Sequence, residues 1–289
     1  MIAFRTVLCP VDFSPATPRQ IDLAVDLCRA FGGRLVLHHN RLSFGTGASV
    51  GWMWKAGHQG ESEAALEARL NACLARVPDG VTAEGLLTEG PVSRAVLAAA
   101  DSIAADLVVL TAHGTHSDSH ASITESVLEH SNRAVIVLHE TDAEPRTPRF
   151  ASPSQEPQVV VAPTDLEPES EGALRLAFDL ARALPIEVHL LHLLPNGRSH
   201  RGEASEEEAR RRMLTLVPED VADRARLHVE HGDAATGIAR AADQLSAACI
   251  VMGEHARRPI RGWFSRDTSR DVLHRAHCPV WYVPATPAA

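Results

Sequence analysis

The chain has 289 residues, of which 45% are hydrophobic, 22% charged and 4% aromatic, as in a globular protein with room for about two domains. Its formal net charge of −9 argues against nucleic acid or an anionic membrane as the main partner. The scarcity of aromatic residues also argues against a platform on which single-stranded bases would stack.

Short apolar runs alternate with segments of helical periodicity along the whole chain. In the first half we predict strands near 5–11, 34–39, 82–88, 106–112 and 134–139, and helices over 17–31, 61–77, 91–104 and 122–131. In the second half we predict strands near 158–164, 187–194, 225–231, 248–253 and 279–284, and helices over 169–183, 203–216, 233–246 and 267–275. The runs 107–110 and 249–252 are apolar on both faces, as parallel strands between two helical layers are. The fold class is therefore α/β, with a doubly wound, Rossmann-like parallel sheet of five strands in each half.

The two halves repeat one pattern of residues at equal spacings. These spacings are 27 positions from Asp12 to His39 and from Asp165 to His192, and 23 positions from Gly90 to His113 and from Gly232 to His255. A repeat of this length corresponds to whole domains, because solenoid units have about 20–50 residues. We expect domains at 1–140 and 157–289, joined by a proline-rich linker over 141–156 whose composition breaks helices and strands and tolerates exposure. The first half has 11 more residues before its glycine, in the loop 40–59.

The cysteines and the apolar runs bear on where the protein resides. The five cysteines are odd in number and scattered, without a Cys-x-x-Cys pair, which is typical of a reduced chain. The first strand begins almost at the N-terminus, so we expect no secretory signal. No apolar run approaches the roughly 18–20 residues of a membrane span. We therefore expect a cytoplasmic protein that does not bind membranes.

Both halves resemble domains of the universal stress protein (UspA) family. The matching features are the aspartate after the first strand, the histidine of the second strand, the glycine turn, the ends of the fourth strands and the closing Cys-Pro-Val run at 278–280, which Arg133-Ala134-Val135 matches more loosely. The resemblance implies a tandem universal stress protein that acts in the stress response. In family members that bind ATP, the site lies at the carboxyl ends of the first and fourth strands, where the first-strand aspartate contacts the base or ribose.

The ATP-binding members carry Gly-x2-Gly-x9-Gly-Ser/Thr after the fourth strand. Glycines let main-chain amides approach phosphate there, and a helix N-terminus adds partial positive charge. The first half keeps Gly114 and Ser122, but it has Thr111 and Ala121 at the other glycine positions and a spacer of only six residues. Ser122 also begins a capping box with Glu125, and we favour that role over phosphate contact. We therefore expect weak or absent ATP binding in the first half.

The second half keeps the full spacing but only the first glycine, Gly253. Asp267 replaces the serine or threonine, and a carboxylate at this position caps the helix and repels phosphate. Arginines of this loop, Arg266 among them, could attract phosphate instead, although we favour a solvated basic loop. ATP is thus a cofactor that the resemblance implies and that both degenerate motifs argue against; if a nucleotide binds, we expect it in the second half.

These comparisons define the candidate ligand-binding residues. They are Asp12, His39, His113, Gly114 and Ser122 in the first half, and Asp165, His192, Gly253, His255 and Arg266 in the second half. Four of them have a simpler interpretation: both aspartates suit a turn or a helix cap, and the second-strand histidines suit a local hydrogen bond at a strand end.

One loop of the first half has a spacing that could suit a metal. His113, His116 and His120 stand at i, i+3 and i+7 and would share one face of a helical turn, so they could hold zinc. This spacing is no established metal motif, and we favour a polar, pH-responsive loop.

No nucleophile elbow, Walker loop or His-Glu-x-x-His motif is present in the sequence, which argues against a conventional enzyme. The first hypothesis is a protein that acts by ligand binding and protein association. The second is an ATP-binding protein, perhaps with slow hydrolysis, that uses the second half. The third is a small-molecule or metal sensor that uses the first-half loop with Trp52, Trp54 and His58.

The closing strands of the two halves are apolar, and the family resemblance implies that they lie at the edge of each sheet. Such edges invite pairing, and a linker of about 16 residues can span the distance between them. We therefore expect the two halves to pair through these strands as a pseudo-dimer, with Ile136 at or under the junction, while further self-association of chains stays open.

Overall fold

The computed structural model describes residues 4–41, 62–112, 121–139, 148–151, 157–195, 202–254 and 266–284. At 121, 122, 202–204, 254, 266 and 267 only the main chain is described. The first half contains β1 (Thr6–Pro10), α1 (Thr17–Phe31), β2 (Arg34–Arg41), α2 (Glu63–Leu74), β3 (Ala83–Glu89), α3 (Val92–Ser102), β4 (Leu107–Ala112), α4 (Ala121–His130) and β5 (Ala134–His139).

The second half repeats this order. It contains β6 (Gln158–Pro163), α5 (Glu171–Ala183), β7 (Ile186–Leu194), α6 (Gly202–Leu216), β8 (Ala225–His231), α7 (Ala234–Gln244), β9 (Cys249–Glu254), α8 (Arg266–Arg275) and β10 (Val280–Pro284). Each predicted strand and helix is present, with ends that differ by a few residues. The sequence did not predict the two short 3-10 segments, η2 (Pro168–Ser170) and η3 (Glu219–Arg224), each of which directly precedes a longer element.

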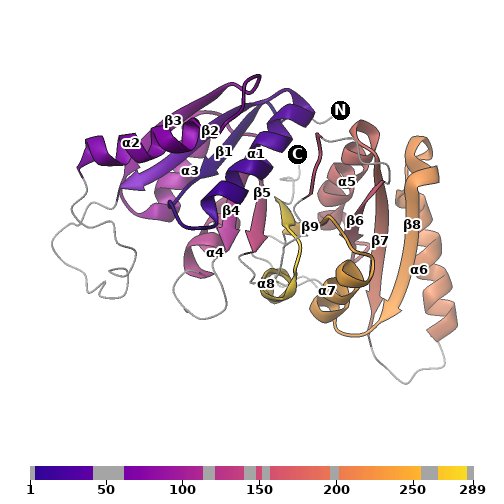
Figure 1. Ribbon diagram of the computed structural model, residues 1–289. Coiled ribbons are helices and arrows are strands. Elements are labelled where there is room, and N and C mark those ends of the chain that lie inside the picture. The colour runs from indigo at the N-terminus through magenta and orange to yellow at the C-terminus, as the bar shows by residue number, and fades with distance from the viewer. Residues whose placement is uncertain are drawn as a thin grey trace.

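All ten strands form one continuous sheet, in the order β3-β2-β1-β4-β5-β10-β9-β6-β7-β8 (Figure 1). Neighbours within each half are parallel, whereas β5 and β10 are antiparallel and pair Val137 with Val280, Ile136 with Trp281 and Val135 with Tyr282. The predicted pseudo-dimer is therefore confirmed, because the two closing strands meet within one chain.

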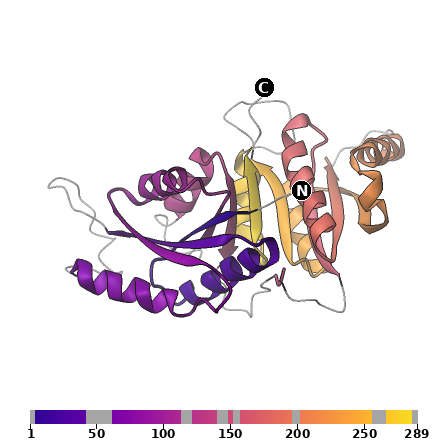
Figure 2. The same cartoon turned by 90° about the horizontal axis from the view of Figure 1, so that it is seen from above.

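Helices cover both faces of the sheet, as the view from above shows (Figure 2). Buried residues of α1, α2, α5 and α6 pack on one face, and those of α3, α4, α7 and α8 pack on the other. Successive strand residues alternate between the two layers: Leu107 and Val109 belong to one, and Val108 and Leu110 to the other. Each layer contains residues of both halves, so the apolar core runs across the junction.

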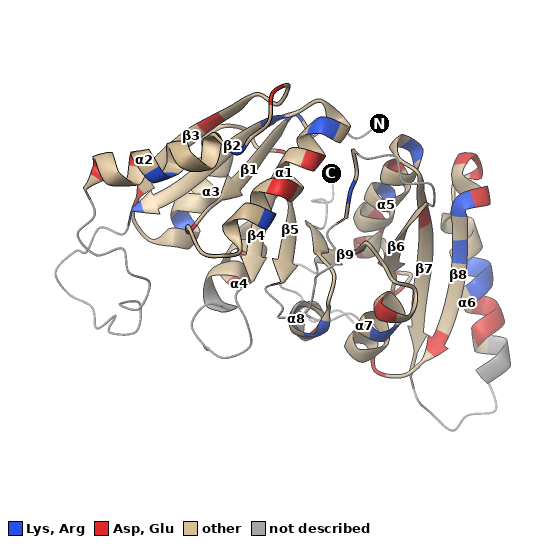
Figure 3. Ribbon diagram, in the orientation of Figure 1, with Lys and Arg blue, Asp and Glu red and all other residues tan. Residues whose placement is uncertain are grey.

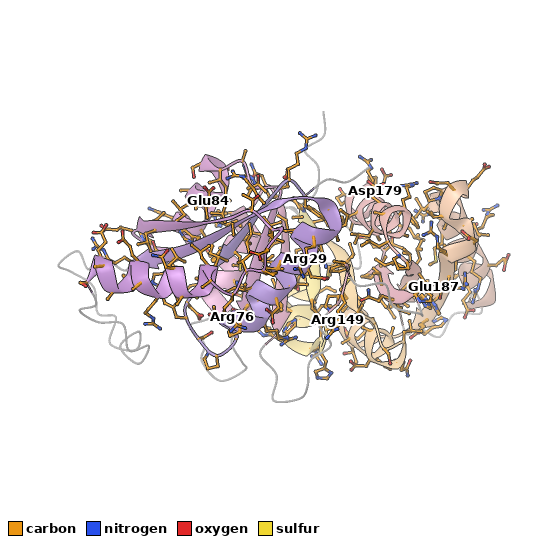
Figure 4. All side chains as sticks on the ribbon, turned by 45° about the horizontal axis from the view of Figure 1, so that its top comes forward. Arg29, Arg76, Glu84, Arg149, Asp179 and Glu187 are labelled. Carbon is orange, nitrogen blue, oxygen red and sulfur yellow. The ribbon has the colours of Figure 1, made fainter. Side chains whose placement is uncertain are left out.

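The described part of the linker, residues 148–151, is held at Phe150: Pro148 and Phe150 are buried, whereas Arg149 and Ala151 are exposed. Phe150 is only 3% exposed, and its ring centroid lies 6.1 Å from that of Trp281. The Asp26 carboxylate on α1 accepts hydrogen bonds from the main-chain N–H groups of Phe150 and Ala151. Arg149 lies between the two halves in Figure 4. The proline-rich composition indicated a segment that tolerates exposure, and it gave no sign that Phe150 would be buried, because an aromatic side chain fills the apolar junction.

Two histidines are buried near the carboxyl ends of half-one strands. Burial lowers the pKa of both His38 and His139 from 6.5 to about 4. The neighbouring His39 lowers the pKa of His38 further. The pKa of His139 is also lowered by the nearby charges of Arg19, His274 and His277. Within the described residues, Nε2 of His139 has no hydrogen-bond partner, whereas Nε2 of His38 lies 2.7 Å from Thr88 Oγ1. Both rings are therefore neutral at pH 7.

Acid should destabilise the protein through these two rings. Between pH 6.5 and 4 each ring binds a proton in the unfolded chain but not in the folded chain, so stability falls as the pH falls. The loss is at most about 1.4 kcal/mol per pH unit for each ring. Urea unfolding across this window should show that the free energy of unfolding falls less steeply with decreasing pH in His139→Gln than in the unmodified chain. The matched control is His231→Gln, which replaces an exposed histidine. An equal slope in His139→Gln and the unmodified chain would contradict the assignment.

Placing a carboxylate at the junction should separate the halves. Ile136 is fully buried against Trp281, so Ile136→Asp should lower the free energy of unfolding by about 4 kcal/mol or more. Leu214→Asp is the control, because Leu214 is 62% exposed, and there we expect a loss of about 1 kcal/mol or less. Urea unfolding followed by circular dichroism measures both. Equal losses in the two variants would show that Ile136 does not support the junction.

Candidate ligand-binding site

The main chain turns in the same strained way after β1 and after β6. Phe13 has a φ of 59° and Leu166 a φ of 65°, in the left-handed region where a non-glycine residue costs about 1–2 kcal/mol. Each follows one of the repeated aspartates. Strain that recurs at the same place in both halves marks this turn as a feature that the surrounding structure holds in place.

The repeated aspartates make local hydrogen bonds in both turns. Asp12 Oδ1 accepts from the main-chain N–H of Ser14 at 2.9 Å and from Thr17 Oγ1 at 3.2 Å. Asp165 Oδ1 accepts from the main-chain N–H of Glu167 at 3.1 Å. Asp12 is exposed, whereas Asp165 is 7% exposed. The turn role expected of such residues thus exists in both halves, and the buried setting distinguishes Asp165.

The repeated histidines lie beside these turns, and each is bound to the main chain. Nδ1 of His39 lies 2.7 Å from the Val11 carbonyl oxygen, and Nδ1 of His192 lies 2.8 Å from the Thr164 carbonyl oxygen. A carbonyl only accepts, so Nδ1 carries the proton in both rings. Burial is the main cause that lowers the pKa of His192, although the Thr164 carbonyl and Asp165 act in the opposite direction. His192 is therefore neutral at pH 7, and its Nε2 is a hydrogen-bond acceptor.

In the first half, side chains of the protein stack at this place. The ring of Phe13 lies on the ring of His39 with centroids 4.2 Å apart and 32° between the planes. The guanidinium carbon of Arg69, from α2, lies 4.3 Å from the centroid of the Phe13 ring. A cation over an aromatic face is attractive, so Phe13 is held between a histidine and an arginine.

In the second half, a hollow of about 440 Å³ lies at the corresponding place. It is bounded by Leu166, His192, Leu194, Ser205, Glu208, Ala209 and Arg212. When α2 and α6 are matched by their buried positions, Leu66 corresponds to Ala209 and Leu70 to Met213. Leu166 and Ala209 are thus smaller than their counterparts Phe13 and Leu66, which explains the space beside His192.

An arginine on each of these helices reaches the strained turn. Arg212 corresponds to Arg69 in the same matching, and its Nη2 donates a hydrogen bond to the Leu166 carbonyl oxygen at 2.7 Å. The sequence analysis missed both arginines. The signal that could have identified them is their equal position before the second buried residue of each helix.

Gly253 and the repeated turn glycines have structural roles that phosphate binding does not require. Gly253 lies against η2: a Cβ there would approach the Glu169 carbonyl oxygen to 3.1 Å and the Ser170 Cα to 3.5 Å. Gly90 and Gly232, the repeated turn glycines, have φ values of 119° and 144°, which favour glycine.

Several predicted residues lie outside the described parts of the chain. These are His113, Gly114, His116, His120, His255 and the loop residues Trp52, Trp54 and His58. Ser122 and Arg266 lie in the first turns of α4 and α8, where only the main chain is described. Among the described residues, no three histidine, cysteine or carboxylate side chains are grouped so as to hold a metal. The helices within the described ranges include none with the length and apolar character of a membrane span.

Comparisons with known proteins agree with this architecture. A family model described as Universal stress protein family matches residues 3–139 and again residues 157–284. The structure of a putative universal stress protein from Pseudomonas aeruginosa UCBPP-PA14 is 17% identical, has a TM-score of 0.64, and is matched over 98% of this chain and 94% of that chain. A universal stress protein from Archaeoglobus fulgidus DSM 4304 is 16% identical, with a TM-score of 0.65 and coverage of 99% and 98%. No curated protein matches in sequence.

The close approach at Gly253 yields a prediction about stability. Gly253→Ala should lower the free energy of unfolding by about 1–3 kcal/mol, because the new methyl group meets main-chain atoms of Glu169 and Ser170, which cannot rotate away. Gly237→Ala is a comparison and not a neutral control, because its Cβ would come within 2.5 Å of Cδ1 of Leu193, a side chain that is only 1% exposed. We expect this variant to be destabilised as well, although alanine favours the helix by about 1 kcal/mol. Thermal unfolding compares the two variants. A Gly253→Ala variant as stable as the unmodified chain would contradict this role.

Proposed function

The chain belongs to the universal stress protein family, and on that premise we propose that it binds a small ligand in its second half. The proposed ligand is an adenine nucleotide or a related planar heterocycle. Binding and protein association, rather than turnover, are the proposed activity, and the cytoplasm is the proposed compartment. The proposed functional units are domains at 1–140 and 157–289.

The hollow beside His192 is the observation that carries this proposal. Leu166, Leu194 and Ala209 give it apolar walls, which suit the faces of a flat ring. Ser205, Glu208 and Arg212 add polar groups at its boundary, so the hollow joins apolar walls to a few hydrogen-bonding groups, as ligand sites do.

The protonation of His192 supports adenine in particular. Its neutral ring leaves Nε2 as an acceptor, and the exocyclic amine of adenine is a donor. The buried Asp165 lies next to Leu166 in the chain, at the side where the family resemblance implies a contact with base or ribose. The proposed site includes Asp165 and His192, together with the sequence candidates Gly253 and His255, and Arg266 is proposed to lie near the phosphate.

The first half is proposed to bind ligand weakly or not at all. Its residues Asp12 and His39 occupy equivalent positions, but Phe13 and Arg69 stack beside His39. A ligand would have to displace an aromatic ring that is already attracted to a cation. Gly114, Ser122 and His113 would complete a site there only if that stack opened. The first half is then mainly a partner for the second.

Calorimetric titration of the full chain with ATP, ADP and adenosine in the presence of magnesium tests the proposal. We expect one site per chain. Ala209→Leu should weaken binding at least about tenfold, because it introduces the side chain that the first half has at this position and reduces the hollow. Asp165→Ala should also weaken binding, whereas the matched variant Asp12→Ala should leave the affinity unchanged.

Two outcomes would contradict the proposal. The first is two equivalent sites per chain. The second is loss of binding in Asp12→Ala with unchanged binding in Asp165→Ala, which would move the site to the first half. Absence of binding by all three compounds would remove adenine derivatives as the ligand class.

A further inference from the structure

The junction between the halves has the geometry of a twofold axis. The last helix and strand of the first half can be aligned with those of the second half. In this alignment Val135, Ile136 and Val137 are equivalent to Val280, Trp281 and Tyr282, in that order. The observed pairs are Val137 with Val280, Ile136 with Trp281, and Val135 with Tyr282. A twofold rotation exchanges the two outer pairs and leaves the central pair on the axis.

In a symmetric dimer, a residue on such an axis meets its own copy. Here Ile136 meets Trp281, and both are fully buried. The Trp281 ring also lies 5.5 Å from Phe4 and 6.1 Å from Phe150, measured between centroids. The space on the axis therefore fits one large and one medium side chain. Two tryptophans would overfill it, and two isoleucines would leave part of it empty.

The two halves also differ in charge on the helices beside this strand pair. By the same correspondence, Glu125 of α4 is equivalent to Arg270 of α8, and Glu129 is equivalent to His274. Glu125 and Arg270 meet across the junction, with Arg270 Nε 2.7 Å from Glu125 Oε1, and His274 Nε2 lies 3.6 Å from the same oxygen. Equivalent positions thus carry acids in the first half and bases in the second; Figure 3 marks basic residues on α8.

We propose that this junction is a self-pairing surface that has diverged, so that the first half fits the second half and rejects a second copy of itself. The residues that determine this choice are Glu125, Ile136, Arg270 and Trp281. Pairing of two first halves would place Glu125 against Glu125, and pairing of two second halves would place Arg270 against Arg270. Like charges at such a contact disfavour the wrong partner, which is how many specific interfaces discriminate.

Single substitutions can build the rejected contacts inside the full chain. Arg270→Glu places two glutamates at the contact, and Glu125→Arg places two arginines there. The double variant Glu125→Arg/Arg270→Glu restores opposite charges with the partners exchanged. Each single variant should melt about 2–4 °C lower than the unmodified chain, and the double variant should regain most of that loss. The single-variant losses should shrink in 1 M salt, where the screening length is about 3 Å.

Amide hydrogen exchange shows whether the effect lies at the junction. We expect faster exchange at Ile136 and Trp281 in both single variants and near-normal exchange in the double variant. The control is Glu230→Arg, which reverses an ion pair to Arg240, 2.6 Å long, on β8 and α7. It should leave exchange in β5 and β10 unchanged. Either of two results would overturn the proposal. One is a double variant that melts no higher than the less stable single variant, and the other is unchanged amide exchange of β5 and β10 in both single variants.

Discussion

β5 and β10 would each be the apolar edge of a five-stranded sheet if the halves came apart. Such an edge exposes unpaired N–H and C=O groups beside buried side chains, and it attracts other chains. Antiparallel pairing removes both edges at once and lets the two apolar layers continue from one half into the other. The linker takes part through Phe150, which packs near Trp281 while Asp26 holds its main chain. The two halves therefore share one core, and the stability of each depends on the other.

The order of the elements could be predicted from the sequence because the strands are apolar on both faces. A run such as 107–110 has nowhere to lie except between two helical layers, and strands of this type with intervening helices leave few possible topologies. The pairing of the closing strands could be predicted from their apolar character together with the edge position that the family resemblance implies. The anchored Phe150 could not be predicted, because its burial depends on Trp281, which lies 131 positions further along the chain. Composition indicates the structural preference of a short segment, and it cannot predict contacts between residues so far apart in the sequence.

The candidate site was predictable only in part, for the same reason. The repeat identified the positions of Asp12, His39, Asp165 and His192, but the difference between the halves arises from side chains on α2 and α6. Arg69 and Arg212 reach the strand ends from distant segments, and the replacement of a leucine by Ala209 has meaning only once α6 is placed. Gly253 was assigned to a phosphate motif by spacing, whereas its contact with Glu169 and Ser170 gives it a packing role that no spacing reveals.

The strained turn after each aspartate connects fold and site. Both halves keep a non-glycine residue in the left-handed region, and the side chain at this position makes a contact of its own in each half. In the first half, Phe13 contributes a ring that packs between His39 and Arg69. In the second half, Leu166 contributes a wall of the hollow, and Arg212 holds its carbonyl group. Arg212 thus joins α6 to the turn beside the hollow, and a ligand bound there as proposed would meet a wall whose main chain is already held by a hydrogen bond. The proposed division of roles is compatible with the shared core, because the filled strand end in the first half and the open one in the second half lie on the same continuous sheet.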